Sequence, residues 1–107
     1  MALTRDFKET IQARAKRDPR FAQVMLDEAA TMFLNGEPDT ARIVLRDLVN
    51  AAMGFEQLAQ ITGKPSKSLH RMLSQEGNPN MDNLASIFDA LRKELRVGIK
   101  ARSVRAA

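Results

Sequence analysis

The 107-residue chain contains no cysteine, no tryptophan and no tyrosine, and it has a single histidine. Without cysteine it can form no disulfide and no cysteine-bound zinc site, and it has no thiol nucleophile. Its five phenylalanines fall on apolar stripes. The chain therefore lacks the exposed aromatic platform on which single-stranded nucleic acids stack. These absences disfavour thiol catalysis, structural zinc and single-strand binding.

Long apolar runs are also missing. No segment approaches the eighteen or more apolar residues of a membrane span, and residues 1–10 contain no apolar core of a signal peptide. A hydrophobic fraction of 44% beside 28% charged residues is typical of one globular domain. We therefore expect a cytoplasmic protein that does not associate with membranes.

The residue groupings that support catalysis are not found either. His70 has no second histidine or cysteine with which to complete a metal shell. Asp27, Glu28 and Asp82 have no nucleophile or paired carboxylate at a usable spacing, and solvated helix faces explain them. We therefore expect no enzyme activity, no bound metal and no cofactor.

The charge that is present is unevenly distributed along the chain, whose net charge is +4. Residues 1–20 carry six basic and three acidic groups, and residues 21–63 carry two basic and six acidic groups. Residues 64–107 carry nine basic and four acidic groups. This pattern indicates one surface for phosphate and another for a different partner. A solvated surface of uneven charge explains it equally well.

Apolar spacing and turn residues predict helices throughout the chain. We expect Thr4 to cap a first helix, and Asp18 followed by Pro19 to begin a second. Asn35 and Gly36 have the sequence of a left-handed C-terminal cap and are expected to end that second helix. The apolar residues expected on the buried sides of these two helices are Phe7, Ile11, Phe21, Val24, Met25, Ala29, Met32 and Phe33.

The C-terminal two thirds of the chain are divided by similar signals. Residues 38–53 are predicted to form a long helix that Gly54 stops, and Asn80 is expected to cap the last helix. Residues 95–99 alternate apolar with polar or small side chains, which fits either a short edge strand or a segment covering the core. A basic C-terminal run suits either an arm lying along phosphates or a solubilising tail, and its residues are Arg92, Lys93, Arg96, Lys100, Arg102 and Arg105. Residues 101–107, at the end of this run, are expected to form a flexible basic tail.

Residues 55–73 are the most informative stretch of the sequence. They predict two short helices joined by a tight turn, in which Gly63 supplies the positive φ angle. Ala59, four residues earlier, is the small residue that lets the two helices cross closely. The side chains expected to point inward are Leu58 and Ile61 from the first helix, and Leu69, Met72 and Leu73 from the second.

The outward face of the second helix then consists of short polar and cationic side chains. Such residues suit base edges and phosphates, and the arrangement is that of a helix-turn-helix that places a recognition helix in the major groove. An ordinary helical hairpin with a solvated outer face is the alternative. The residues on this outward face are Ser66, Lys67, Ser68, His70 and Arg71.

Four segments together carry a family resemblance: residues 33–38 (FLNGEP), 49–63 (VNAAMGFEQLAQITG), 68–73 (SLHRML) and 76–79 (EGNP). With these, residues 33–98 resemble the addiction-module antidote proteins, members of the Xre/lambda-repressor-like class of helix-turn-helix regulators. The resemblance implies a five-helix DNA-binding core, a dimer on a palindromic operator and, in many relatives, a toxin partner. It also implies that the Gly-Asn-Pro turn joins the recognition helix to the next helix.

Carried onto this chain, the family's base-reading positions fall on Ser66 and Lys67 and, one turn later, on His70 and Arg71. Gln57 matches a position that commonly touches a phosphate. The chain departs from many relatives at Pro65, where they have a serine or threonine cap. The helix then begins near Lys64 or Ser66, so which of Ser66, Lys67 and Ser68 reaches a base stays open.

The sequence thus predicts an all-α, lambda-repressor-like helix-turn-helix bundle. Residues 1–35 form an N-terminal helical extension, residues 36–100 the DNA-binding domain, and residues 101–107 the tail. The predicted function is a homodimeric, sequence-specific regulator of transcription that binds double-stranded DNA, a repressor, in the setting of an autoregulating antitoxin. The alternative is a protein-interaction module in which residues 1–53 sequester a toxin or another partner and DNA binding is secondary.

Overall fold

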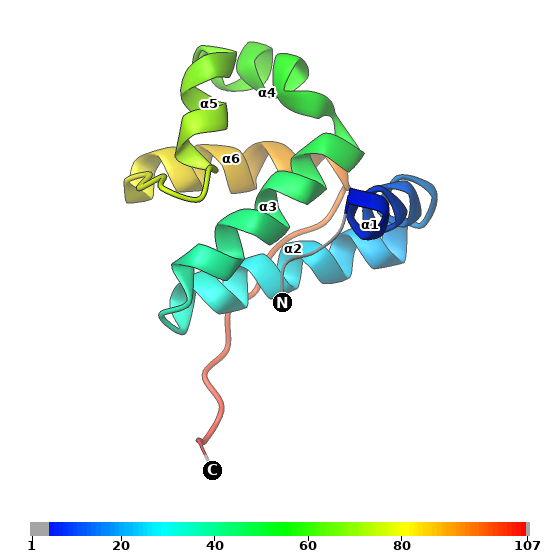
Figure 1. The fold of residues 1–107 in the computed structure, drawn as a ribbon. Coiled ribbons are helices and arrows are strands. Elements are labelled where there is room, and N and C mark those ends of the chain that lie inside the picture. Colours follow the sequence, from blue (N-terminus) through cyan, green and yellow to red (C-terminus); the bar gives the residue numbers. More distant parts are fainter. Residues whose placement is uncertain (1–4, 107) are drawn as a thin grey trace.

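Six helices follow one another along the computed structural model, which describes residues 5–106, with side chains described from residue 9 onward. Within residues 5–106 there is no strand. The Thr4 cap and the Phe7 side chain lie outside what is described. The helices are α1 (Arg5–Arg17), α2 (Pro19–Leu34), α3 (Pro38–Ala52), α4 (Gly54–Thr62), α5 (Ser66–Met72) and α6 (Met81–Glu94) (Figure 1).

Both ends of α2 are formed as its sequence predicts. The Asp18 carboxylate accepts hydrogen bonds from the backbone N–H groups of Arg20 at 3.0 Å and Phe21 at 3.3 Å, and Pro19 opens the helix. At the other end Gly36 has a φ of +80°, and the N–H of Glu37 donates to the carbonyl of Met32 at 2.8 Å. This left-handed cap satisfies a terminal carbonyl and turns the chain into α3.

The core lies where α1, α2 and α3 pack against one another and where α6 closes the far side of α3 and α4 (Figure 1). Leu26 of α2, Leu45 and Leu48 of α3, and Ile87 and Leu91 of α6 are all 0% exposed. One buried cluster therefore runs from the N-terminal helices to α6. The N-terminal helices supply part of the core on which the α4–α5 pair is mounted.

Two side chains predicted to be buried are exposed instead. Val24 on α2 is 53% exposed and Ile61 on α4 is 52% exposed, so both predictions are wrong. On α2, the buried residues include Ala22 and Leu26, and Val24, two residues from each, falls on the opposite side of the helix. On α4, Phe55 and Leu58 face the core, and Ile61 lies beyond the edge of that face.

The segment after α6 covers the core and forms no strand. Asn80 caps α6 as predicted, accepting a hydrogen bond from the N–H of Asn83 at 2.8 Å. Arg96 ends the helix with a left-handed φ of 59°, after which Val97 and Ile99 pack against the core. Residues 100–106 have no regular structure and are exposed (Figure 1). No helix in residues 5–106 is long and apolar enough to cross a membrane.

Candidate nucleic-acid interface

The turn between α4 and α5 is formed by Gly63, whose φ of +71° is the left-handed conformation that glycine adopts without strain. Its N–H donates to the carbonyl of Ala59 at 2.9 Å. The Thr62 hydroxyl donates to the Leu58 carbonyl at 2.8 Å and accepts from the N–H of Lys64 at 3.3 Å. The turn is therefore held by its own residues, as the sequence predicts.

The inner side of the α4–α5 pair is apolar and closed. Leu58 of α4, Leu69 of α5 and Leu73 directly after α5 are each 0% exposed. Met72 is half-buried and packs against the same cluster. These contacts fix α5 on the body of the molecule, with its opposite face toward solvent.

The start of α5 is defined by Pro65. Pro65 is the residue before the helix, with a φ of −61° and a ψ of 139°, and the helix itself begins at Ser66. No side chain caps this end of the helix. The boundary that the sequence left open between Lys64 and Ser66 therefore lies at Ser66, directly after the extended Pro65.

The outward residues of α5 differ in exposure. Lys67, His70 and Arg71 are exposed, whereas Ser66 and Ser68 are half-buried. Lys67 and Arg71 are four residues apart and therefore adjacent on one side of the helix. Gln57, on α4, is exposed too. All six predicted contact residues thus lie on the surface of one helix pair, with Lys67 and Arg71 the most favourably placed cations.

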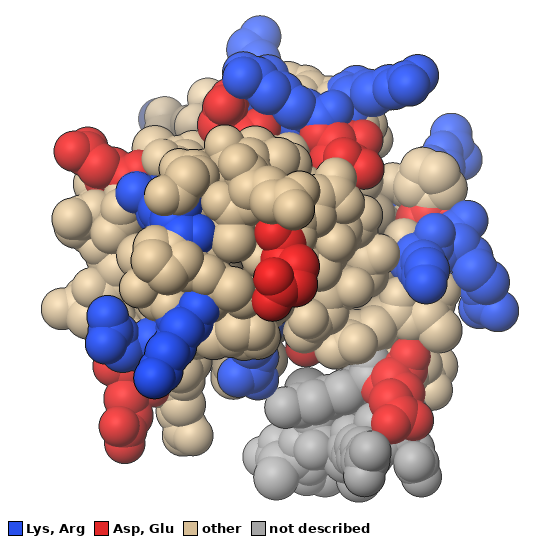
Figure 2. All heavy atoms as spheres, turned by 90° about the horizontal axis from the view of Figure 1, so that it is seen from above, with Lys and Arg blue, Asp and Glu red and all other residues tan. Residues whose placement is uncertain are grey.

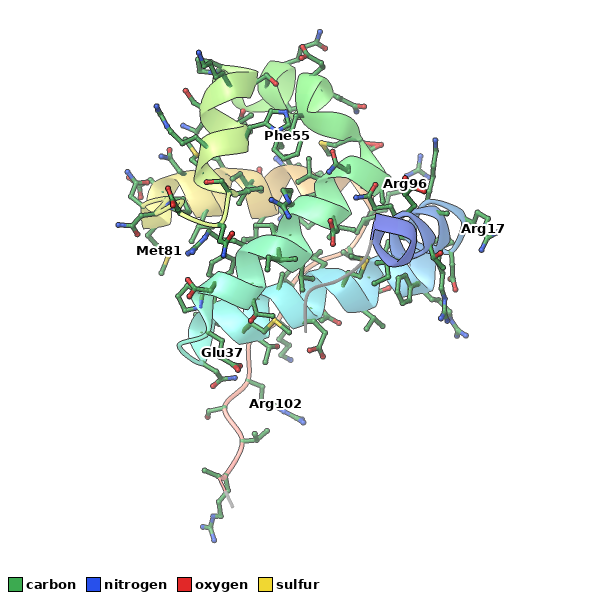
Figure 3. The ribbon with its side chains drawn as sticks, viewed as in Figure 1. Arg17, Glu37, Phe55, Met81, Arg96 and Arg102 are labelled. Carbon is green, nitrogen blue, oxygen red and sulfur yellow. The ribbon has the colours of Figure 1, made fainter. Side chains whose placement is uncertain are left out.

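His70 has an aromatic neighbour that the sequence analysis missed. Its ring stacks on Phe55 of α4, with the ring centroids 3.8 Å apart and the planes 20° from parallel. Phe55 is only 5% exposed and lies under α4, toward the interior of the molecule (Figure 3). One face of the imidazole is therefore covered, and only its edge and other face are open to a ligand. No spacing rule connects residues fifteen positions apart.

A second feature missed from the sequence is the buried side chain of Arg42 on α3. It is 7% exposed, and its Nε donates to the Ser74 carbonyl at 3.1 Å. Its Nη2 donates to the Gln75 carbonyl at 3.0 Å and to the Asp39 carboxylate at 2.7 Å. Arg42 therefore ties the end of α5 to α3, and helps to fix the direction in which α5 points.

The basic residues at the end of α6 are partly neutralised. Arg92 and Lys93 both pair with Asp89, at 2.8 Å and 2.9 Å. The hydrogen bond from Lys93, with the charges of Lys93 and Arg92, holds the pKa of the Asp89 carboxyl below its ordinary value although desolvation opposes this. These two cations are therefore less available to a phosphate than their place in the basic C-terminal run indicates.

Seen from the side of α4 and α5, much of the middle of the molecule is uncharged, and Lys and Arg side chains project around its edge (Figure 2). Acidic side chains interrupt this pattern. Within the described residues there is no cluster of three or more side chains that could hold a metal ion. Searches against known protein families, curated proteins and solved structures find no match for this chain.

Proposed function

We propose that the protein is a sequence-specific regulator that binds double-stranded DNA by placing α5 in the major groove. The observation that carries the proposal is the pairing of a closed apolar side with a cationic outer side in the α4–α5 pair. Leu58 and Leu69 are fully buried, whereas Lys67 and Arg71 are exposed four residues apart. A rigid helix with short polar and long cationic residues on its free face suits both base edges and phosphates.

A single α5 of seven residues is about 10 Å long at 1.5 Å per residue, and so covers only a few base pairs. Recognition of a unique site therefore needs a second reading helix, which a symmetric dimer supplies. We propose a homodimer on a pseudo-palindromic operator, with half-sites about 34 Å apart. The biological setting that we propose is repression, including repression of an antitoxin's own operon.

The test is selection of bound duplexes from a random pool by the full-length protein. A palindromic consensus with half-sites about one helical turn apart, bound by two chains, supports the proposal. An asymmetric consensus bound by one chain would contradict the proposed dimer but not DNA recognition. A pool that shows no enrichment after repeated rounds at low salt would contradict DNA recognition itself.

A second candidate function is sequestration of a protein partner by α2. Val24 and Leu34 are 53% and 66% exposed on this helix. The acidic Asp27 and Glu28 are exposed on it as well. Exposed apolar residues beside carboxylates suit a basic protein partner with an apolar contact. Replacing Val24 and Leu34 with serine should then abolish capture of that partner while leaving the selected DNA consensus unchanged.

A further inference from the structure

The corner between α1 and α2 concentrates positive charge far from α5. Arg14, Lys16 and Arg17 lie in the last turn of α1, Arg20 lies in the first turn of α2, and all four are exposed. We call these four residues the basic corner. The nearby carboxylate of Asp18 accepts two backbone N–H groups at the start of α2. Within the described residues, none of the four cations pairs with a carboxylate.

Helix stability explains only part of this charge. Cations in the last turn of α1 interact favourably with the negative end of the helix dipole. Arg20, however, lies at the positive end of α2, where a cation is unfavourable and where α2 has no acidic residue in its first turn. Arg14 is held over the Phe21 ring at 4.4 Å, whereas Arg17 projects from the edge of the molecule (Figure 3). Helix stability therefore does not account for Arg20, whereas binding to an anionic ligand outside the fold does.

The size of the molecule brings this corner within reach of a duplex bound at α5. The protein measures 32 Å and 30 Å along its two shorter principal axes, and about 9 base pairs at about 3.4 Å each span such a distance. The α5 helix covers only a few of these base pairs. The α1 helix packs beside α3, which leads directly into α4 (Figure 1). In Figure 2, viewed from the α4–α5 side, basic side chains project at the edge where Figure 1 places α1.

We infer that the basic corner is a second phosphate-binding surface, which contacts the backbone of duplex DNA beyond the site read by α5. The inference rests on the proposed function and extends it to the N-terminal helices. Such contacts carry no base information, but each releases counterions and makes binding more dependent on salt. The cations that the sequence placed in a basic C-terminal run, Arg92 and Lys93, are paired with Asp89 and are the weaker candidates.

The experiment compares two full-length double variants that each remove two positive charges. Arg17→Gln with Arg20→Gln alters the basic corner, and Arg92→Gln with Lys93→Gln is the control with the same net charge. Affinity for the selected operator is measured by fluorescence anisotropy between about 50 and 200 mM salt, a range over which phosphate contacts dominate the change. Circular dichroism confirms that both variants fold.

The corner variant should lower the slope of log affinity against log salt by about 1 to 2, because each lost phosphate contact contributes about 0.9. The control variant, with Arg92→Gln and Lys93→Gln, should lower this slope by less than half as much. The difference should disappear on a duplex trimmed to the bases that α5 protects, and the base preference should stay the same. An unchanged slope, or equal changes in both variants, would overturn the inference and leave an acidic protein as the ligand to seek. A wild-type protein that shows no preference for any duplex would contradict the proposed function itself, on which this inference rests.

Discussion

At the scale of single residues, the arginine on α5 and the arginine that binds the segment directly after it have opposite surroundings. Arg71 is exposed on the outer face of α5. Arg42 is buried beneath the end of the same helix, where it donates hydrogen bonds to two backbone carbonyls and one carboxylate. An exposed cation is available to bind a ligand, whereas a buried and hydrogen-bonded cation stabilises the fold. The two residues should therefore affect different measurements.

Replacing Arg71 with alanine should weaken binding to the selected operator by about 1–3 kcal/mol and relax the preference at particular bases, if Arg71 contacts a base with two hydrogen bonds. Competition binding with single-base variants of the operator measures this effect. Lys100→Ala, in the exposed segment after α6, is the control and should weaken all duplexes alike or have no effect. Unchanged affinities for both operator and random DNA would show that α5 is not the reading helix.

Replacing Arg42 with methionine should lower the free energy of unfolding by about 2–3 kcal/mol, because the Ser74 and Gln75 carbonyls lose a charged donor. Urea unfolding measures this loss. Asp39→Ala is the matched control, because it removes only the partner whose side chain is 88% exposed. That change should cost less than about 1 kcal/mol. Equal losses in the two variants would mean that the ion pair, rather than the tie to α5, gives Arg42 its effect.

At the scale of elements, the α4–α5 turn depends on the backbone of Gly63. Gly63→Ala should destabilise the protein by about 1–2 kcal/mol, since an L-residue at a φ of +71° is strained even though open space surrounds the position. Gly98→Ala is the control, because Gly98 has open space and no positive φ. It should change stability by no more than about 0.5 kcal/mol. Thermal or urea unfolding of both variants distinguishes backbone strain from simple loss of glycine.

The end of α6 should make a pH-dependent contribution to stability. Lys93, with Arg92, lowers the pKa of Asp89 in the folded protein. This contribution is present above the ordinary carboxyl pKa of about 3.9, and it is lost as the pH falls through the lower pKa of the folded state. Asp89→Asn should therefore reduce the urea midpoint at pH 7 but not near pH 2. An equal reduction of the midpoint at both pH values would contradict this assignment.

Helix ends proved more predictable from the sequence than helix faces. Caps depend on a few neighbouring residues, so Asp18, Gly36, Gly63 and Asn80 were each assigned correctly. Faces depend on which neighbour a helix packs against, and an apolar residue near the boundary of a stripe fits either side. That is why the buried positions predicted for Val24 and Ile61 are wrong.

The candidate site was predictable to a similar degree. The outward direction of Lys67 and Arg71 follows from the apolar residues on the other side of the same helix. The Phe55–His70 stack and the tie from Arg42 to Ser74 join residues that are far apart in the chain. Such contacts exist only once the helices have packed, and no local pattern indicates them. Recognition of DNA by this face stays a prediction.

At the scale of the whole molecule, the N-terminal helices share one core with the rest. Leu26 of α2 is 0% exposed in the cluster that also contains Leu45 and Ile87. Leu26→Ala should therefore cost about 3–5 kcal/mol of unfolding free energy. Val24→Ala, two residues earlier but 53% exposed, should cost less than about 0.5 kcal/mol. Urea unfolding of the two variants tests whether α2 is an integral part of the fold.

The same packing implies that residues 36–107 should not fold stably alone. Each large α2 side chain removed from the core contributes about 1.5–3 kcal/mol, and the total stability of a domain is only about 5–15 kcal/mol. A shortened chain should lose cooperative thermal unfolding, while any residual DNA binding should keep its base preference. If the shortened chain instead unfolded cooperatively near the temperature of the full protein, α1 and α2 would be an appendage rather than part of the core.

The Phe55–His70 stack also provides an internal spectroscopic reporter. The chain has one histidine and lacks tryptophan and tyrosine, so its intrinsic fluorescence is weak and its imidazole resonances belong to one residue. Ring currents from Phe55, 3.8 Å away, should move those resonances from their positions in an unstructured chain. Because the two rings come from α4 and α5, the shift persists only while the helices stay together. A simple proton spectrum can therefore follow the geometry of this helix pair during unfolding or titration with a ligand, without any added label.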